Sequence, residues 1–342
     1  MENNLTRRDF VMLTTMAGTG LSFGLTALQP TEAFAQGANA PDKISAYLTP
    51  IAVADDCVRL AMYSATIAEA FKQSLTKHLD VVRLGGAMRS GHKHVPTLFS
   101  QCRDRWATRG KGDVTPQKLA LATGWLFHKA ADTQFSAASR VSATKSHDED
   151  RIDSTIYQDI AVLREIYLSE KEPSASTASN GMSVHPSIQA VSVKDLNDLF
   201  DAMGRRLLIQ LHTFEPDAED VDGWLPRLFA WRERQDALFR RYAEAYRSPD
   251  PGKVRRYITG ANFYDRTDPI IRLARSLQHG AANNKTDFDR AMAAANSQSQ
   301  YAQALRTGYR HLQAASEFFE RSIDEQQLKN RLGLMNTQES SL

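Results

Sequence analysis

A histidine and an aspartate four residues apart are the strongest candidates for chemistry in this sequence. His128 and Asp132 lie in Gly124-Trp-Leu-Phe-His-Lys-Ala-Ala-Asp132, a stretch whose apolar spacing predicts a helix. Side chains at positions i and i+4 lie on one face of a helix, and imidazole with carboxylate is an ordinary ligand pair for zinc. The pair therefore predicts either part of a metal site or a hydrogen-bonded pair on a partly buried helix.

Further candidate ligands lie on both sides of this helix. His92 and His94 fall in a loop rich in glycine, histidine and arginine that we expect at residues 85–94. On the other side, a predicted acidic loop at residues 146–150, with Asp153 and Asp159, offers substitute ligands for zinc or a harder cation. Such an acidic run is more typical of a solvated loop.

The stretch at residues 124–132 closely resembles the Gly-Trp-Leu-x-His-x-x-Ala-Asp helix of bacterial zinc-dependent phospholipase C-like domains. That superfamily is all-helical and exported, and it is related to single-strand nucleases that use a three-zinc cluster. The resemblance implies that His128 is a zinc ligand, that Asp132 bridges two metals, and that His92 or His94 takes the place of an earlier histidine ligand. It extends over roughly residues 53–168.

The chain departs from the family pattern at three places. Arg89-Ser90 stands where the family has Pro-Asp, Ser136-Ala137 stands where it has His-Pro, and residues 157–161 lack the ligands of its late His-x-x-x-Glu helix. A complete three-metal cluster is therefore not expected. Either the site is reduced to one metal or none and the scaffold is kept for binding, or the substitute ligands serve.

Two functions from different classes follow. The first is an exported metal-dependent phosphoesterase of the phospholipase C-like type, acting on a phosphoester or lipid substrate. Zinc held by His128, Asp132 and His92 or His94 would activate water, and Arg89 would neutralise charge on the phosphoryl oxygens. The second is a non-catalytic periplasmic binding or assembly protein on the same scaffold. The departures favour the second function, and the intact helix motif favours the first.

The N-terminus has the pattern of a twin-arginine signal peptide. Arg7-Arg8 precede an apolar segment at residues 11–28, and Ala33-Phe34-Ala35 offers the small alternate side chains that signal peptidase accepts. Gly18, Gly20 and Gly24 interrupt the segment and Pro30 follows it, which disfavours a single membrane anchor. We therefore expect residues 1–35 to be removed and the mature protein, beginning at Gln36, to reach the periplasm through the twin-arginine export machinery.

Composition narrows the partners further. The chain has 42 basic and 40 acidic residues, a formal net charge of +2, which gives no general case for binding nucleic acid. No segment after the signal is long and apolar enough to cross a bilayer. Cys57 and Cys102 are the only cysteines, and in an oxidising compartment we expect them to form one disulfide.

Apolar residues recur at helical spacing in nearly every long segment, so the predicted fold is an all-α multi-helix bundle. Small polar residues at 171–186 predict a linker between a phospholipase C-like helical block at 36–170 and a second block at 187–335, followed by a disordered tail at 336–342. Whether the blocks share one core stays open. The predicted helices are residues 53–79, a short one ending near 106, 115–140, 153–169, 193–211, 224–246, 268–278 and 287–332.

Overall fold

The structure is a computed structural model that describes residues 48–87, 94–140, 147–168, 237–238, 240–278 and 285–334. These residues form helices and contain no strand, which confirms the predicted all-α fold. The predicted signal peptide, the linker, the tail and the helix at 193–211 lie outside the described residues. None of the described helices is both long enough and apolar enough to span a lipid bilayer.

The helices follow one another in two runs. The first run is α3 (Thr49–Tyr63), α4 (Glu69–Lys77), α5 (Leu79–Ala87), α6 (Val95–Trp106), α7 (Thr115–Arg140), α8 (His147–Val162) and the π-helix η2 (Leu163–Leu168). The second run begins with helical residues 240–247. It continues with α12 (Pro251–Val254), the π-helix η4 (Arg255–Thr259), α13 (Pro269–Gln278), α14 (Lys285–Ala294), the 3₁₀ helix η5 (Ala295–Ser297), α15 (Gln300–Phe319) and α16 (Glu325–Arg331).

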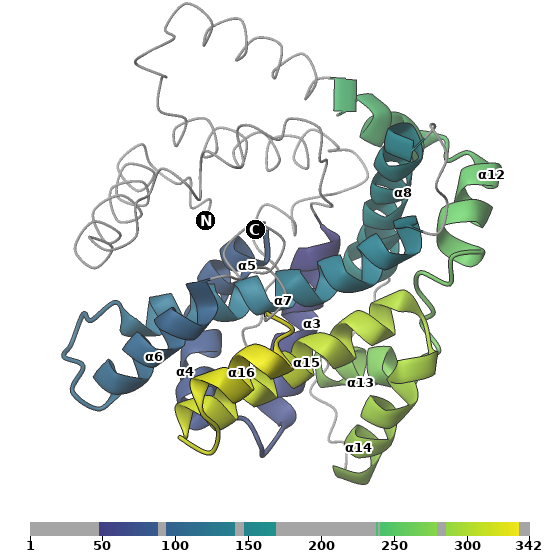
Figure 1. The fold of residues 1–342 in the computed structure, drawn as a ribbon. Helices are drawn as coiled ribbons and strands as arrows, with labels where there is room; N and C mark the ends of the chain where they lie inside the picture. Colours follow the sequence, from purple (N-terminus) through teal and green to yellow (C-terminus); the bar gives the residue numbers. More distant parts are fainter. Residues whose placement is uncertain are drawn as a thin grey trace, which may run out of the picture.

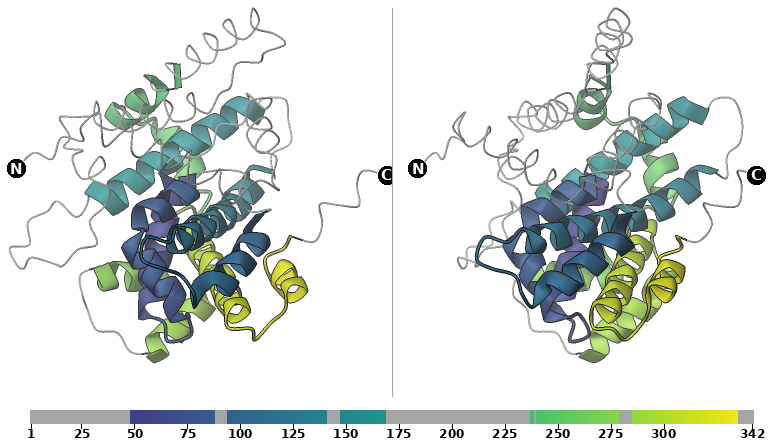
Figure 2. Two further views of the ribbon diagram at one scale, coloured as in Figure 1. Left: turned by 90° about the vertical axis from the view of Figure 1, so that its left-hand side faces the viewer. Right: turned by 60° about the vertical axis from the view of Figure 1, so that its left-hand side comes forward.

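Helix α3 lies at the centre of the described structure. Helices α5, α7, α13 and α15 all pack against it, as Figures 1 and 2 show. Every residue of α3 from Thr49 to Ala61 is buried except Ile51. A helix surrounded in this way is expected to be apolar on every face, so each charged residue that it carries must be paired inside the protein.

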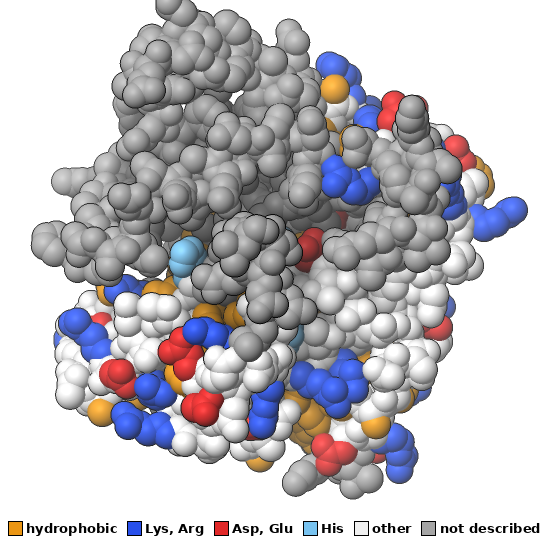
Figure 3. Space-filling view, in the orientation of Figure 1, with side chains coloured by type: hydrophobic (Ala, Val, Ile, Leu, Met, Phe, Trp, Pro, Cys, Tyr) orange, Lys and Arg blue, Asp and Glu red, His pale blue; other side chains and the backbone are white. Residues whose placement is uncertain are grey.

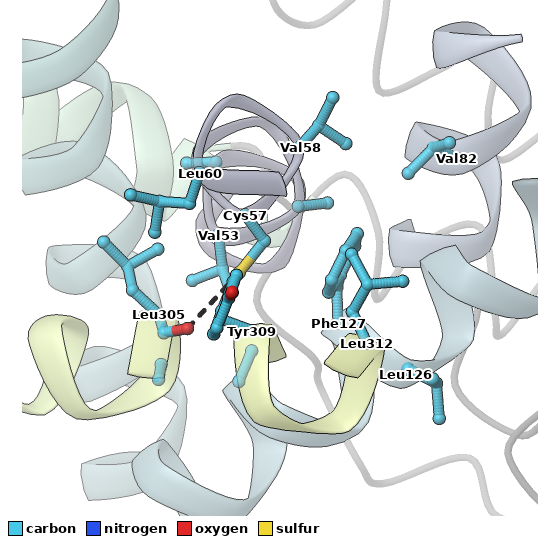
Figure 4. Close-up of a cluster of buried hydrophobic side chains, with 14 of the residues drawn as sticks. Val53, Cys57, Val58, Leu60, Val82, Leu126, Phe127, Leu305, Tyr309 and Leu312 are labelled. Carbon is cyan, nitrogen blue, oxygen red and sulfur yellow. Dashed lines mark hydrogen bonds between the residues drawn. The ribbon is translucent and has the colours of Figure 1, made fainter. Parts of the chain in front are cut away.

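Residues from both runs form one hydrophobic core. Figure 4 shows Val53 and Cys57 of α3 beside Phe127 of α7 and Leu305 of α15. The core continues from the first run into Tyr242 and through the second run as far as Leu332. The described parts of the two predicted blocks therefore pack around a common core.

The predicted helix at 53–79 is wrong as a single helix, because α3 ends at Tyr63 and α4 begins at Glu69. Ser64 Oγ accepts a hydrogen bond from the backbone N–H of Thr66 at 3.2 Å. The backbone N–H of Ala68 donates to Ser316 Oγ of α15 at 2.6 Å. Serine side chains here take backbone donors that a continuous helix would use, and the chain turns.

The predicted helix at 287–332 is also wrong as one element, because α14, η5, α15 and α16 occupy this region. Ser299 caps α15 by accepting a hydrogen bond from the backbone N–H of Ala302 at 3.3 Å. Asp324 forms a capping box with Gln327 at the start of α16, accepting from its backbone N–H at 2.7 Å. Each cap satisfies backbone donors that have no partner within the helix and so starts a new helix.

Other predicted boundaries are closer to the structure. Helix α6 ends at Trp106, close to its predicted end. Helix α7 covers the predicted residues 115–140, and α13 begins one residue after the predicted start at 268 and ends at Gln278 as predicted. Two predicted loops are partly helical: α5 continues through Ala87, so the loop expected at 85–94 begins later, and α8 begins at His147, inside the expected acidic loop.

Candidate functional site

Gly124, which opens the family-like motif, allows α5 and α7 to pack unusually closely. A Cβ atom at Gly124 would lie 2.2 Å from the carbonyl oxygen of Val82, and one at Gly85 would lie 2.4 Å from that of Leu121. Neither distance is compatible with a real side chain. The two glycines therefore bring the backbones of α5 and α7 together and fix their relative position.

His128 is buried at this helix contact, with 5% of its surface exposed. Its Nδ1 lies 2.8 Å from the carbonyl oxygen of Gly86, one of the last carbonyls of α5. A carbonyl oxygen only accepts, so Nδ1–H is the donor in this hydrogen bond. A backbone carbonyl holds the tautomer of many zinc-binding histidines in the same way.

The described residues do not complete a zinc site around His128. Asp132, one turn further along α7, is exposed, and His94 lies half-buried at the N-terminal end of α6. His92 lies outside the described residues. Within the described part of the chain, no three histidine, cysteine, aspartate or glutamate side chains are placed to hold one metal ion. Since a zinc site needs at least three protein ligands, the described donors do not fit zinc by themselves.

Asp159, one of the substitute ligands, serves as a cap instead. The carboxylate is fully buried, and its Oδ1 accepts hydrogen bonds from the backbone N–H of Leu48 at 3.1 Å and of Thr49 at 2.8 Å. Oδ1 also accepts from Thr49 Oγ1 at 2.7 Å, and Oδ2 accepts from the hydroxyl of Tyr242 at 2.7 Å. Asp159 of α8 thus anchors the N-terminus of the central helix α3, where a negative charge is favourable.

Asp153, another of the substitute ligands, is held in ion pairs. Its carboxylate pairs with Arg241 and, at 2.7 Å, with Lys253. Asp150, in the predicted acidic loop, lies in α8 and accepts from Arg256 at 2.6 Å and from the Tyr257 hydroxyl at 3.0 Å. These carboxylates tie α8 to the elements beside it, which Figure 1 shows at the upper right.

The predicted disulfide is wrong, because Cys57 and Cys102 are both free and buried. Cys57 Sγ donates to the carbonyl of Leu305 at 3.6 Å, and Cys102 Sγ donates to that of Thr115 at 3.7 Å. Burial raises the pKa of Cys57 well above its ordinary value and that of Cys102 to about 12, so both remain thiols. The two cysteines behave as small core residues.

A buried cluster of charged residues was not predicted from the sequence. Arg83 of α5 makes a two-point ion pair with Asp55 of α3, at 2.7 and 3.1 Å. The neighbouring Asp56, fully buried, pairs with Arg59 and with Arg275 of α13. The only signal in the sequence is Asp55-Asp56-x-x-Arg59 inside an otherwise apolar helix.

Tyrosine side chains complete this cluster. The Tyr301 hydroxyl donates to Asp56 Oδ2 at 2.9 Å, and the Tyr167 hydroxyl lies 3.4 Å from Asp55 Oδ2. Burial, and then the nearby aspartates, raise the pKa of both tyrosines well above the usual value. Burial also raises the pKa of Tyr264 to about 12. All three phenols therefore keep their protons, and Tyr301 and Tyr167 donate theirs to the aspartates.

His311 of α15 is a second buried titratable group that the sequence did not single out. It is 9% exposed, and its Nδ1 has no hydrogen-bond partner among the described residues. Burial, followed by the charge of Lys129, lowers the pKa of His311 to about 4, although a hydrogen bond to the backbone of Leu126 acts in the opposite direction. The imidazole is therefore neutral at pH 7.

We expect His311 to make the protein less stable in mild acid. A folded-state pKa of about 4, below the ordinary 6.5, means that the unfolded chain binds the proton more readily. Stability present above pH 6.5 should be lost as the pH falls toward 4, up to roughly 3 kcal/mol. In urea titrations at pH 7 and pH 4.5, the His311→Gln variant should lack most of the loss of unfolding free energy that His311 causes in the wild type.

His78→Gln is the control. Burial also lowers the pKa of His78, but that side chain is only half-buried, so this variant should reduce the loss of unfolding free energy by a smaller amount.

Comparison with known proteins does not extend these observations. No protein-family model matches the chain, and neither a curated protein nor a solved structure is similar enough to count as a match.

On the face in Figure 3, the described lysine and arginine side chains are intermixed with aspartate and glutamate.

Proposed function

We propose that this chain is an exported, non-catalytic helical binding protein in which the family-like helix motif serves packing. The observation that supports this best is that residues of the motif join two helices. Gly124 permits the close approach of α5 to α7, and His128 binds the carbonyl of Gly86. The substitute ligands Asp153 and Asp159 likewise serve in ion pairs and as a helix cap. His128, Asp153 and Asp159 are thus used to hold helices together.

A zinc-dependent phosphoesterase, acting on a phosphoester or lipid, is the second candidate. It is favoured by the orientation of His128, whose Nδ1–H points to a backbone carbonyl as it does in many zinc-binding histidines. Asp132 with His92 or His94 would then complete the ligand set. Zinc bound there would supply an activated water for hydrolysis.

Metal analysis of protein recovered from the periplasm, without added ions, separates the two candidates. The proposed function predicts a mature chain beginning at Gln36 that carries no stoichiometric zinc. His128→Ala should then cost about 1 kcal/mol of stability, the worth of one hydrogen bond, and leave the metal content unchanged. The measurements are elemental analysis and urea unfolding.

His128→Gln is the matched variant, because its side-chain amide can still donate to the Gly86 carbonyl. In a binding protein it should be more stable than His128→Ala. In a zinc enzyme both variants should lose metal and phosphoesterase activity together. Two or more equivalents of zinc in the wild-type protein would contradict the proposed function.

A further inference from the structure

The turn between α6 and α7 projects from one end of the described helices, at the left edge of Figure 1 and in the right-hand view of Figure 2. Residues 107–114 are exposed, except that Arg109 and Asp113 are partly buried. A Cβ atom at Gly110 or Gly112 would have no heavy atom within 4 Å. The turn is therefore open to a partner.

Positive charge is concentrated around this turn. Residues 103–118 contain five basic and two acidic side chains, a formal charge of +3, whereas the whole chain of 342 residues carries only +2. One of the two carboxylates, Asp104, is shared by two arginines: it pairs with Arg103 at 3.1 Å and with Arg321 at 3.6 Å. Its negative charge is therefore already offset.

The second carboxylate, Asp113, is used within the turn. Its side chain is only 8% exposed, and its Oδ1 accepts hydrogen bonds from the backbone N–H and the hydroxyl of Thr115 at 2.8 and 2.6 Å. Its Oδ2 accepts from Arg105 at 2.8 Å. Arg109 and Lys111 make no ion pair within the described part of the chain. Their charges are therefore available to an anionic partner.

An apolar and an aromatic side chain accompany these basic groups. Val114 is 41% exposed, and besides Leu84 it is the only large hydrophobic side chain among the described residues that is exposed. The guanidinium group of Arg109 lies 3.7 Å from the ring centroid of the partly exposed Trp106 and donates to the Trp106 carbonyl. These contacts hold the charge of Arg109 at the surface. Tryptophan beside basic groups is typical of the boundary between water and a bilayer.

We propose that the turn at residues 105–114 docks on the surface of an anionic phospholipid bilayer. Arg109 and Lys111 would lie among the headgroups, and Val114 would enter the boundary with the acyl chains. An acidic protein would match the same charges, but a stable protein interface covers about 800 Å² on each partner, more than one projecting turn offers. This surface is separate from the His128 motif, so the proposal goes beyond the proposed function and does not depend on it.

The test is co-sedimentation of the full mature protein with vesicles of equal parts phosphatidylglycerol and phosphatidylcholine, in about 0.1 M sodium chloride. The double variant Arg109→Gln, Lys111→Gln should bind about 30-fold more weakly, because each basic group near an anionic surface contributes a factor of about 5. Val114→Ser leaves the charge unchanged and should weaken binding by about 3-fold.

The double variant Arg247→Gln, Arg255→Gln is the matched control. It removes the same charge from two exposed arginines of other helices, which also make no ion pair among the described residues. Salt screens charges that lie far from the membrane, so its binding should change by less than about 3-fold. Circular dichroism confirms that each variant is folded.

Three results would overturn the proposal. The first is a wild-type protein that does not sediment with the anionic vesicles, which would leave an acidic protein surface as the partner to seek. The second is equal sedimentation with vesicles of phosphatidylcholine alone. The third is an equal loss of binding in the two double variants, because net charge and not this turn would then be responsible. A zinc-free protein that binds no vesicles would refute this surface alone, since metal content tests the proposed function.

Discussion

Gly124→Ala should destabilise the protein by about 3 kcal/mol, although alanine is normally the better helix former. The new Cβ would lie 2.2 Å from the Val82 carbonyl oxygen and 2.9 Å from the Cα of Gly85. Both are backbone atoms, so the contact can be relieved only if α5 moves away from α7. That movement would also weaken the hydrogen bond between His128 and Gly86. Urea unfolding followed by circular dichroism measures the loss.

Gly110→Ala is the control for this prediction. A Cβ atom at Gly110 has no heavy atom within 4 Å, and the residue lies in an exposed turn. We expect its unfolding free energy to stay within about 0.5 kcal/mol of the wild type. If Gly124→Ala were instead more stable than the wild type by the ~1 kcal/mol that helix propensity alone predicts, α5 and α7 could not be in close contact.

Asp159→Ala should have an effect of similar or larger size, about 4 kcal/mol or more. The substitution leaves the backbone donors of Leu48 and Thr49 and the hydroxyls of Thr49 and Tyr242 without their common acceptor. All of these groups are buried, so water cannot replace the carboxylate at no cost. The loss should appear as a lower urea midpoint with the slope of the transition preserved.

Asp324→Ala tests whether burial is the cause of the large destabilisation expected for Asp159→Ala. Asp324 also caps a helix, α16, but it is exposed, and water can satisfy the donors that it leaves. Its loss should cost about 1 kcal/mol, the ordinary worth of a cap. Equal effects at the two positions would show that Asp159 contributes no more than a surface cap, and the proposed anchoring of α3 would be wrong.

Periodicity predicted the helices that are continuous and flanked by clear turns. Helix α7 begins at Thr115 and ends at Arg140 as predicted, with Pro116 in its first turn. The same periodicity runs across the breaks at 64–68 and 320–324, where hydrogen bonds of Ser64 and Asp324 end one helix or start another. Apolar spacing does not detect such caps, and the bond between Ala68 and Ser316 joins residues that are 248 positions apart.

The candidate site was only partly predictable for a related reason. The i, i+4 spacing of His128 and Asp132 predicted a common helix face, but the structure buries His128 and exposes Asp132. The charged cluster was missed because the partners of Asp55 and Asp56 come from α5 and α13. A local pattern cannot show that Arg275, 219 positions away, neutralises a carboxylate in the central helix.

The contact between α3 and α15 sets when this protein can acquire its structure during synthesis. Cys57 binds the carbonyl of Leu305, and Ser64 binds the hydroxyl of Tyr309 at 2.6 Å, across more than 240 residues in each case. The ribosome makes α3 among the first helices and α15 among the last. The apolar surface of α3 therefore cannot be fully buried until α15 has been translated. Folding that is dominated by such distant contacts is slow. A chain that stops before α15 would leave α3, the first of the described helices, exposed to chaperones and proteases.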